Sequence, residues 1–319
     1  MSDIVFLDRE TLDQGDLDLT AIESLPGGYR DYAQTHPDQA AERIAQASIV
    51  IVNKVLLSAK TLAQCPNLKL ICVIATGVNN IDTQAAAAQG IRVVNCQGYG
   101  TASVSQHVMA LMFALSTRLV SYVDAVRAGR WQQAPHFCFL DYPIRELAGQ
   151  TLLVVGHGEL GGAVATLAEA VGMQVEVAER PGASTVRPGR VDFHQAIASA
   201  DVVTLHCPLT NETRNLIDAK VFARMKSTAL LINTARGGIV NEDDLADALR
   251  RGEIAGAGMD VLTEEPPRNG NVLLDADIPN LLVTPHSAWG SRTARQRIVE
   301  QTLENIHAWQ ANDPIRVVV

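Results

Sequence analysis

Short apolar runs alternate with amphipathic stretches from one end of the chain to the other. In the first third, the apolar runs predict strands at Ile4–Leu7, Ile49–Asn53, Leu70–Ala75 and Arg92–Asn95. Apolar residues at helical spacing between them predict helices at Gln39–Gln46, Ala59–Cys65 and Asp82–Gln89. Continuous apolar strands separated by helices are typical of parallel sheets covered by helices on both faces. The pattern therefore predicts an α/β protein.

The remainder of the chain continues this alternation, with one interruption. A long helix is expected from about Thr101 to Thr117, and another from about Thr293 to Asn312, because apolar residues recur on one face of each. Between them, the pattern predicts strands at Val202–His206, Leu230–Ala235, Gly256–Leu262 and Leu281–Thr284. The region Ala128–Leu147 has aromatics and prolines without periodicity, so it is predicted to be an ordered loop.

The most informative run is Gly156-His157-Gly158-Glu159-Leu160-Gly161, which follows the apolar stretch Leu152–Val155. In such a strand–turn–helix, the first glycine permits a tight turn and the second lets backbone N–H groups approach a pyrophosphate. The third lets the helix pack closely on the strand. Glu179 ends the next apolar run, at the spacing where an acid accepts hydrogen bonds from an adenosine ribose. The run predicts dinucleotide binding, and the structural alternative is an ordinary glycine-bearing βα turn.

The position of the glycine turn indicates the domain organisation. A chain of 319 residues is long enough for about two domains, and the turn lies in its middle. We therefore predict two doubly wound parallel-sheet domains, with a Rossmann cofactor domain inserted in a flavodoxin-like substrate domain. The cofactor domain is expected at residues 100–290, and the substrate domain at 1–99 and 291–319.

Composition and charge narrow the class of protein. The net charge of −9 offers no basic surface for nucleic acid, and no apolar segment is long enough to span a membrane, so neither partner is expected. The first residues lack the features of a signal peptide. Five cysteines without CxxC spacing indicate free thiols and a cytoplasmic location. No HExxH or comparable spacing indicates a metal site, and no metal is expected.

Three further candidates directly follow predicted strands, where α/β sheets place functional residues. Arg236 is followed by two glycines, and its planar fork suits a carboxylate. Glu265 and His286 follow the next two strands. Taken singly, each has an ordinary structural explanation: Arg236 as a surface arginine, Glu265 as an acid in a solvated loop and His286 as a structural histidine. Beside a dinucleotide site, they are the anion binder, orienting acid and acid/base that hydride transfer requires.

Together these motifs resemble the D-isomer-specific 2-hydroxyacid dehydrogenase family over nearly the whole chain. The matching segments are Ala75–Asp82, Ser103–His107, the glycine turn, Thr234–Gly238, Asp260 with Glu265, and Pro285-His286. Two more segments, Phe137–Leu147 and His286–Trp289, are similar to the glycerate dehydrogenase/hydroxypyruvate reductase branch of that family.

The resemblance implies a role for each matching residue. Arg236 would bind the substrate carboxylate and carbonyl, His286 would be the acid/base, and Glu265 would pair with it and keep it protonated. Backbone N–H groups of Gly77, Val78 and Asn79 would bind the same carboxylate. The implied cofactor-binding residues are Thr101, Gly156, Gly158, Glu159, Leu160, Gly161, Glu179, Arg180, Cys207, Pro208, Thr213, Thr234, Ala235, Asp260, His286 and Ala288. Asp260 would hold the nicotinamide carboxamide, and a homodimer would form through the long helix and the loop Gly129–Leu147.

The cofactor is expected to be NAD, because Glu179 would accept a hydrogen bond from the ribose 2′-hydroxyl and repel a 2′-phosphate. Arg180 follows directly and can pair with that phosphate, which leaves NADP open.

Hydroxypyruvate and glyoxylate are the leading expected substrates, reduced to D-glycerate and glycolate. The alternatives are the same chemistry on another 2-keto acid, such as phenylpyruvate, and a cofactor-sensing binding protein of the corepressor type. Glu265 speaks against a formate dehydrogenase, since formate enzymes of this family pair the histidine with glutamine. The sequence leaves open the physiological keto acid, the direction of the reaction and the oligomeric state.

Overall fold

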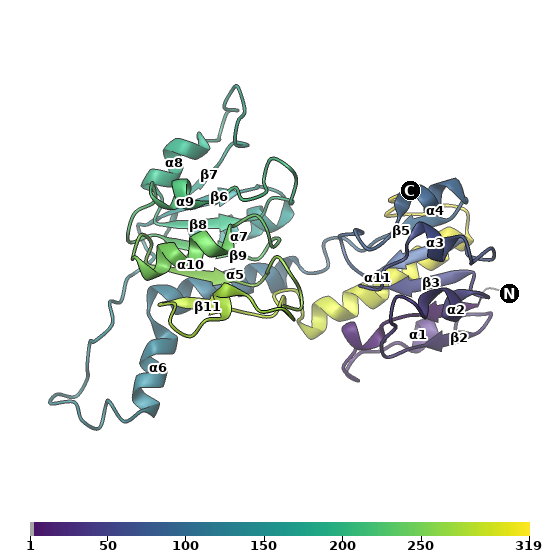
Figure 1. Cartoon of the computed structure of the whole chain (residues 1–319), viewed down its shortest axis with the longest axis horizontal. Coiled ribbons are helices and arrows are strands. Elements are labelled where there is room, and N and C mark those ends of the chain that lie inside the picture. The colour runs from purple at the N-terminus through teal and green to yellow at the C-terminus, as the bar shows by residue number, and fades with distance from the viewer. Residues whose placement is uncertain (1–2) are drawn as a thin grey trace. The chain divides into compact units, whose positions relative to one another are not determined.

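A computed structural model describes residues 3–319, which fold into two compact units (Figure 1). Unit 1 comprises Met1–Gly100 and Gly290–Val319, and unit 2 comprises Thr101–Trp289. The chain therefore passes from unit 1 into unit 2 once and returns once, so that unit 2 is an insertion in unit 1.

Unit 1 contains a five-stranded sheet in which every pairing between strands is parallel. The strands are β1 (Ile4–Phe6), β2 (Tyr29–Asp31), β3 (Ile49–Val52), β4 (Leu70–Val73) and β5 (Arg92–Val94). Their order, β2-β1-β3-β4-β5, is that of flavodoxin-like folds. Every residue of β1, β3 and β4 is buried, which explains why these strands read as unbroken apolar runs.

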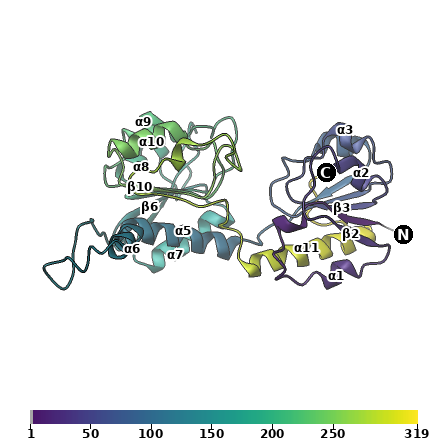
Figure 2. The ribbon, with the colours of Figure 1, turned by 60° about the horizontal axis from the view of Figure 1, so that its bottom comes forward.

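Helices cover both faces of the unit 1 sheet. They are α1 (Thr20–Glu23), α2 (Ala40–Ile44), α3 (Ala59–Leu62), α4 (Thr83–Ala88), α11 (Arg292–Gln310) and the 3-10 helix η1 (Arg9–Thr11). Figure 2 shows α1 and α11 on one face and α2 and α3 on the other. The long helix α11 begins where the chain returns to unit 1, and the hydroxyl of Ser291 accepts a hydrogen bond from the N–H of Ala294 (3.2 Å).

Unit 2 contains a six-stranded, entirely parallel sheet. Its strands are β6 (Thr151–Val155), β7 (Gln174–Val177), β8 (Val202–Leu205), β9 (Leu230–Asn233), β10 (Gly256–Met259) and β11 (Leu281–Val283). In the order β11-β10-β9-β8-β6-β7, the chain proceeds from β6 to one side and then resumes at β8 on the other. Sheets of this kind bind ligands at such a reversal, beyond the carboxyl ends of the strands.

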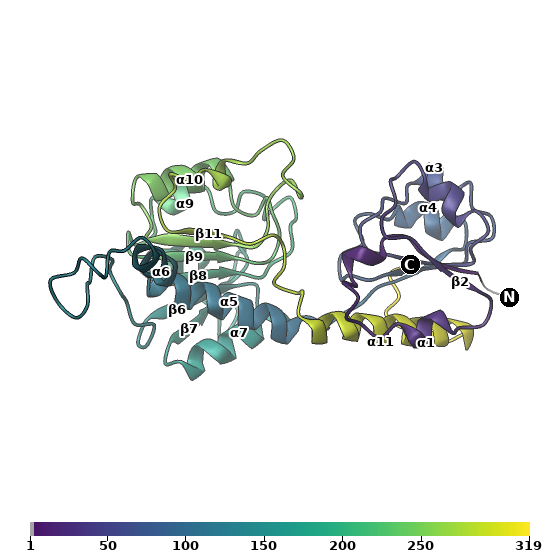
Figure 3. The ribbon, with the colours of Figure 1, turned by 90° about the horizontal axis from the view of Figure 1, so that it is seen from below.

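The helices of unit 2 divide between the two faces of the sheet. They are α5 (Thr101–Ser116), α6 (Leu119–Arg127), α7 (Glu159–Ala170), α8 (Phe193–Ser199), α9 (Ala219–Phe222), α10 (Glu242–Arg250) and the 3-10 helix η2 (Val272–Leu274). Figure 3 shows α5 and α7 on one face and α9 and α10 on the other. Each face has its own apolar core, and the second core also contains Phe193 and Ile197 of α8. Both units are thus the doubly wound α/β domains predicted from the sequence.

The strand β2 and the helix α6 are among the elements that the sequence did not predict. The strand β2 has only three residues, none of them buried, at the edge of its sheet, so it lacks an apolar run. The helix α6 has no buried residue, so no apolar stripe faces a core. The strands predicted from the sequence are also one to three residues longer than the observed ones. For example, β4 ends at Val73 and β10 at Met259, and the apolar residues that follow them lie in irregular backbone.

Among residues 3–319, no single helix combines the length and apolar composition needed to cross a membrane. The pair α5 and α6 meets these criteria when taken together, with a bend of 61° between the two helices. Half of the residues of α5 are buried in the core of unit 2.

Candidate active site

The glycine turn connects β6 to α7 at the reversal of strand order. Gly156 has a φ of 98°, and a Cβ there would lie 2.6 Å from the backbone nitrogen of Cys207. A Cβ on Gly161 would lie 2.1 Å from the carbonyl oxygen of Gly156. Around Gly158, which caps α7, a Cβ would meet no heavy atom within 4 Å. The turn is therefore tightly packed on its inner side and open at the amino end of the helix, as a bound pyrophosphate requires.

Other residues of the implied cofactor site surround this turn. The hydroxyl of Thr101, at the start of α5, donates to Oε1 of Glu159 at the start of α7 (2.5 Å). After β8, the hydroxyl of Thr213 donates to the carbonyl oxygen of Pro208 (2.7 Å). It also accepts from the N–H of Thr210 (2.7 Å). These bonds fix the segment Cys207–Thr213 beyond the end of β8, next to β6 in the sheet.

Glu179 lies just beyond β7 and is 4% exposed. Its carboxylate accepts four hydrogen bonds. Two come from Nε and Nη2 of Arg187 (2.7 and 2.6 Å), and two from the backbone N–H groups of Arg180 and Arg187 (2.8 and 3.1 Å). The Arg187 guanidinium holds the pKa of Glu179 well below its usual range. The expected ribose acid is thus in position, but it is paired with an arginine that the sequence reasoning missed.

Arg236 follows β9, and its side chain is exposed. The segment that carries it is fixed by Asn233, whose side chain accepts from the N–H of Ala235 (3.0 Å) and donates to the carbonyl oxygen of Arg236 (3.0 Å). A Cβ on Gly237 would lie 1.9 Å from the carbonyl oxygen of Leu262. The arginine segment therefore packs directly against the segment that follows β10.

Glu265 and His286 form the centre of the site. Oε2 of Glu265 lies 2.6 Å from Nδ1 of His286, and Oε1 accepts from the N–H of Leu262 (2.8 Å). The side chains of the pair are 34% and 31% exposed, so a substrate can reach them. Because Nδ1 faces the carboxylate, Nε2 is the ring nitrogen left to exchange a proton.

The backbone at His286 is left-handed, with a φ of 52°, which is rare for a bulky residue. Two contacts hold it there. The indole Nε1 of Trp289 donates to the carbonyl oxygen of His286 (2.9 Å), and the N–H of His286 donates to the carbonyl oxygen of Thr284 (2.9 Å). Strained backbone of this kind clusters at functional sites, where the surrounding structure maintains it.

Asp260, which is 1% exposed, anchors the segment around His286. Its Oδ1 accepts from the hydroxyl of Thr284 (2.5 Å) and the N–H of Ser287 (2.9 Å), and its Oδ2 accepts from the N–H of Ala288 (2.9 Å). The hydroxyl of Thr284 donates its proton to this carboxylate, so it accepts from Nε2–H of His107 (3.0 Å). In this structure Asp260 contacts the segment that carries the histidine, a role that the sequence reasoning did not assign.

Helix α5 supports the same segment. His107 and Ser103 lie one helical turn apart, and the hydroxyl of Ser103 donates to the carbonyl oxygen of Ala288 (2.6 Å). The sequence reasoning noted both residues only as part of a motif. Their i, i+4 spacing was the available signal, because residues four apart share one face of a helix.

The structure groups the expected site residues into three sets. Those around the glycine turn surround the ends of β6 and β8. Arg236, Glu265 and His286 follow the consecutive strands β9, β10 and β11. The third set, Gly77, Val78 and Asn79, lies in unit 1 beyond β4. There the N–H of Ile81 donates to the carbonyl oxygen of Val78 (3.0 Å).

An unsatisfied hydroxyl suits a bound cofactor. In the described part of the chain, Oγ1 of Thr234 is buried and has no hydrogen-bond partner, and it lies beyond β9 beside the arginine. Buried polar groups normally find a partner, so this hydroxyl is available to a ligand. Together with the open helix end at Gly158, it fits a dinucleotide. Fold and site define a dinucleotide-dependent oxidoreductase with a carboxylate–histidine pair beyond the ends of two neighbouring strands.

Comparisons with known proteins identify the family within this class. Residues 109–288 match the family described as D-isomer specific 2-hydroxyacid dehydrogenase, NAD binding domain. The chain is 47% identical to the glycerate dehydrogenase of Methylorubrum extorquens over 319 residues, which are 99% of this chain and 98% of that one. It is 34% identical to the hydroxypyruvate reductase of Blautia hydrogenotrophica over 320 residues, 99% of each chain.

A solved structure agrees with these relatives. The D-lactate dehydrogenase of Aquifex aeolicus, complexed with NAD and lactic acid, has a TM-score of 0.80 and 28% identity. The match covers 97% of this chain and 96% of that one. The chain belongs to the D-isomer specific 2-hydroxyacid dehydrogenase family, and it is an NAD-dependent enzyme that interconverts a 2-keto acid and a D-2-hydroxy acid.

Proposed function

We propose that this enzyme reduces hydroxypyruvate to D-glycerate and glyoxylate to glycolate, with NADH as the reductant. The observation that carries the chemistry is the 2.6 Å contact between Nδ1 of His286 and Oε2 of Glu265. The choice of substrate is supported by two relatives, a glycerate dehydrogenase and a hydroxypyruvate reductase, each aligned over 99% of this chain.

A dinucleotide held at the glycine turn would supply the hydride for the keto carbon. Arg236 binds the substrate carboxylate and carbonyl, and so presents the keto carbon in a fixed orientation. His286 donates a proton from Nε2 to the substrate oxygen as it becomes an alcohol. Glu265 orients the ring through Nδ1 and stabilises the imidazolium, and in the reverse direction Nε2 takes the proton back.

Other residues are proposed to bind and position. Backbone N–H groups of Gly77, Val78 and Asn79 would donate to the substrate carboxylate, a role that rests on the family resemblance. Asp260 positions His286 through the N–H groups that follow it, and its expected contact with the nicotinamide carboxamide remains part of the proposal. The residues around the glycine turn would bind the dinucleotide, with Thr234 donating its free hydroxyl.

The test is the initial rate of NADH consumption with hydroxypyruvate, glyoxylate, pyruvate and phenylpyruvate, each assayed with the wild type and His286→Gln. Fast wild-type turnover of hydroxypyruvate that His286→Gln abolishes supports the proposal. A clear preference for phenylpyruvate would instead indicate another 2-keto acid. NADH binding without turnover of any keto acid would favour a cofactor-sensing binding protein.

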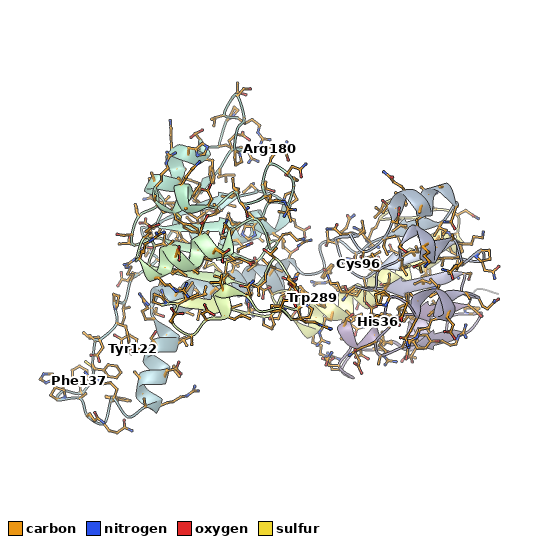
Figure 4. All side chains as sticks on the ribbon, viewed as in Figure 1. His36, Cys96, Tyr122, Phe137, Arg180 and Trp289 are labelled. Carbon is orange, nitrogen blue, oxygen red and sulfur yellow. The ribbon has the colours of Figure 1, made fainter. Side chains whose placement is uncertain are left out.

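We also propose that two copies of the chain form a homodimer through the loop Gly129–Leu147 and α6. The sequence analysis named the long helix, α5, beside this loop, but half of the residues of α5 are buried in the core of unit 2. Figure 4 labels Tyr122 on the helix and Phe137 on the loop. The most exposed apolar side chains there are Phe137 (89%), Leu140 (76%), Ile144 (55%), Leu119 (54%) and Trp131 (52%). An ion pair between Arg130 and Asp141 (2.7 Å) joins two parts of this loop. Exposed apolar patches of this kind mark interaction sites.

Light scattering on the purified protein tests the dimer. The wild type is expected to have twice the mass of one chain, and Phe137→Glu with Leu140→Glu is expected to have the mass of a single chain. A monomeric wild type would contradict the dimer.

A cytoplasmic location is proposed from the cysteines. All five are free thiols, and Cys65, Cys72 and Cys96 are buried. Free thiols persist where the environment is reducing. A fluorescent fusion that distributes through the cytoplasm would agree with this location, and export of the fusion would contradict it.

A further inference from the structure

We propose that Arg187 makes the adenosine-ribose end of the cofactor site accept a 2′-phosphate, so that the enzyme uses NADPH as well as NADH. The inference rests on the dinucleotide site of the proposed function, and it assigns the choice between the two cofactors to a residue that lies outside the glycine turn. It is carried by the contacts of Glu179, the acid that would ordinarily exclude NADPH.

The acceptor capacity of Glu179 is already used by donors of the protein itself. An ionised carboxylate has about four lone-pair directions. Here four donors occupy them: Nε and Nη2 of Arg187, and the backbone N–H groups of Arg180 and Arg187. A ribose diol can bind this carboxylate only if the Arg187 side chain first moves away from it. The acid is thus not free to select NADH in the usual manner.

The charge around Glu179 also differs from that of an NAD-selective site. An isolated acid repels a 2′-phosphate, but the Arg187 guanidinium neutralises this acid at 2.6–2.7 Å. The segment that continues from Glu179 adds Arg180 and Arg190 and contains no acid before Asp192. The local charge is therefore positive, and a phosphate dianion is attracted to it.

The arginine is placed to bind a ligand as well as Glu179. The side chain of Arg187 is 52% exposed, although its guanidinium group contacts the buried carboxylate of Glu179. It extends from the irregular segment 180–190, which follows β7 and projects from unit 2 (Figure 1). The exposed Arg180 lies at the base of this segment (Figure 4). A guanidinium fork binds phosphate in the same bidentate manner as carboxylate, so Arg187 can turn from Glu179 to a 2′-phosphate without leaving the site.

A purely structural role for Arg187 makes a different prediction. If the arginine only fixed the segment 180–190, its removal would weaken NADH and NADPH alike. If it binds the 2′-phosphate, its removal weakens NADPH selectively and releases Glu179 for the ribose diol of NADH. The two roles are therefore separated by the ratio of the two affinities.

The experiment is a fluorescence titration of NADH and of NADPH into the full-length protein, without keto acid. It compares the wild type with Arg187→Ala, Arg187→Lys and the control Arg250→Ala. The control removes another arginine that bridges carboxylates, Asp275 and Asp277 (3.0 and 2.9 Å), from α10 in the same unit. The melting temperature of each variant is recorded to confirm that it folds.

The wild type is expected to bind both cofactors, with NADPH the more sensitive to salt, since it carries the additional phosphate. Arg187→Ala is expected to weaken NADPH at least tenfold while NADH stays unchanged or tightens. Arg187→Lys keeps the charge without the fork and should lie between, and Arg250→Ala should change neither. Equal weakening of both cofactors by Arg187→Ala would overturn the proposal. A wild type that binds NADH but not NADPH would also overturn it while leaving the proposed function intact, whereas binding of neither would contradict both.

Discussion

Unit 2 contains two ion pairs with the same shortest contact distance, to which we assign different purposes. At the ends of β10 and β11, Glu265 lies 2.6 Å from His286, and beyond β7, Glu179 lies 2.6 Å from Arg187. Both carboxylates also accept backbone N–H groups. The difference is the cation: an imidazole gains and loses its proton near neutral pH, whereas a guanidinium stays charged. The first pair can deliver a proton, and the second supplies a fixed charge.

The environments of the two carboxylates agree with this division. Glu265 is one-third exposed, so its partner is open to substrate and solvent. Glu179 is nearly buried, and its pKa is held well below the usual range by Arg187. Because a depressed carboxyl pKa keeps the group ionised at every pH above it, the Glu179 pair stays charged throughout the range of an enzyme assay. Cofactor preference should therefore not follow pH, but turnover should.

The largest effect is expected from removing the proton donor. His286→Gln should lower kcat for hydroxypyruvate reduction about 10²- to 10⁴-fold, the range for loss of a general acid. The NADH dissociation constant should change little, because the glycine turn and Glu179 are untouched. Initial rates and a cofactor titration measure the two quantities. A kcat within a few-fold of the wild type would show that another group donates the proton.

The next largest effect is expected at Arg236. Arg236→Lys keeps the positive charge but loses the planar fork, so the substrate carbonyl is no longer held in one orientation. We expect kcat/KM to fall about 10²-fold, a loss of about 3 kcal/mol in transition-state stabilisation. The fall should appear in kcat as well as KM. Normal kinetics in this variant would place the carboxylate site elsewhere.

Glu265→Gln tests the pair through pH. Reduction uses a proton on Nε2 of His286, and the Glu265 carboxylate lies 2.6 Å from the other ring nitrogen. Without that charge the histidine loses its proton more readily, and the upper pH limit of kcat/KM should move to lower pH. The profile should be recorded from about pH 5 to pH 9. An unchanged upper limit would remove Glu265 from proton transfer.

A smaller effect is expected from Asp260→Asn, which acts on the position of His286. An amide cannot accept all three donors that Asp260 now satisfies, so one buried donor loses its partner, at a cost of about 1–3 kcal/mol in unfolding free energy. We expect a lower melting temperature and about a tenfold lower kcat, with the pH limit unchanged. Thr284→Val, which removes one of the three donors, should be milder. A shift of the pH limit in Asp260→Asn would mean that this residue takes part in proton transfer.

The sequence was sufficient where local patterns decide the structure. Buried parallel strands read as continuous apolar runs, and the glycine turn is recognisable because close packing excludes side chains at Gly156 and Gly161. Residues that directly follow a strand, such as Arg236 and His286, could be predicted to lie at one edge of the sheet. The chemistry proposed for them rests on residue type, position and the family resemblance, and it stays a prediction.

The sequence was insufficient where the structure depends on irregular backbone. Arg187 is eight residues from Glu179, with a proline and a glycine between them, and no periodicity places its side chain on the acid. The left-handed backbone of His286 and the contacts of Asp260 depend on a turn conformation that pattern does not encode. The helix α6 was missed for a different reason: it buries no side chain, so its sequence shows no apolar stripe that would face a core.

The most direct test of the difference between the two ion pairs is the pH profile of hydroxypyruvate reduction, measured with NADH and with NADPH. The enzymes compared are the wild type, Glu265→Gln and Arg187→Ala. We predict that Glu265→Gln moves the upper pH limit equally for both cofactors, and that Arg187→Ala changes the ratio of their rates at every pH without moving the limit. A cofactor ratio altered by Glu265→Gln, or a pH limit moved by Arg187→Ala, would contradict the separation of proton transfer from fixed charge.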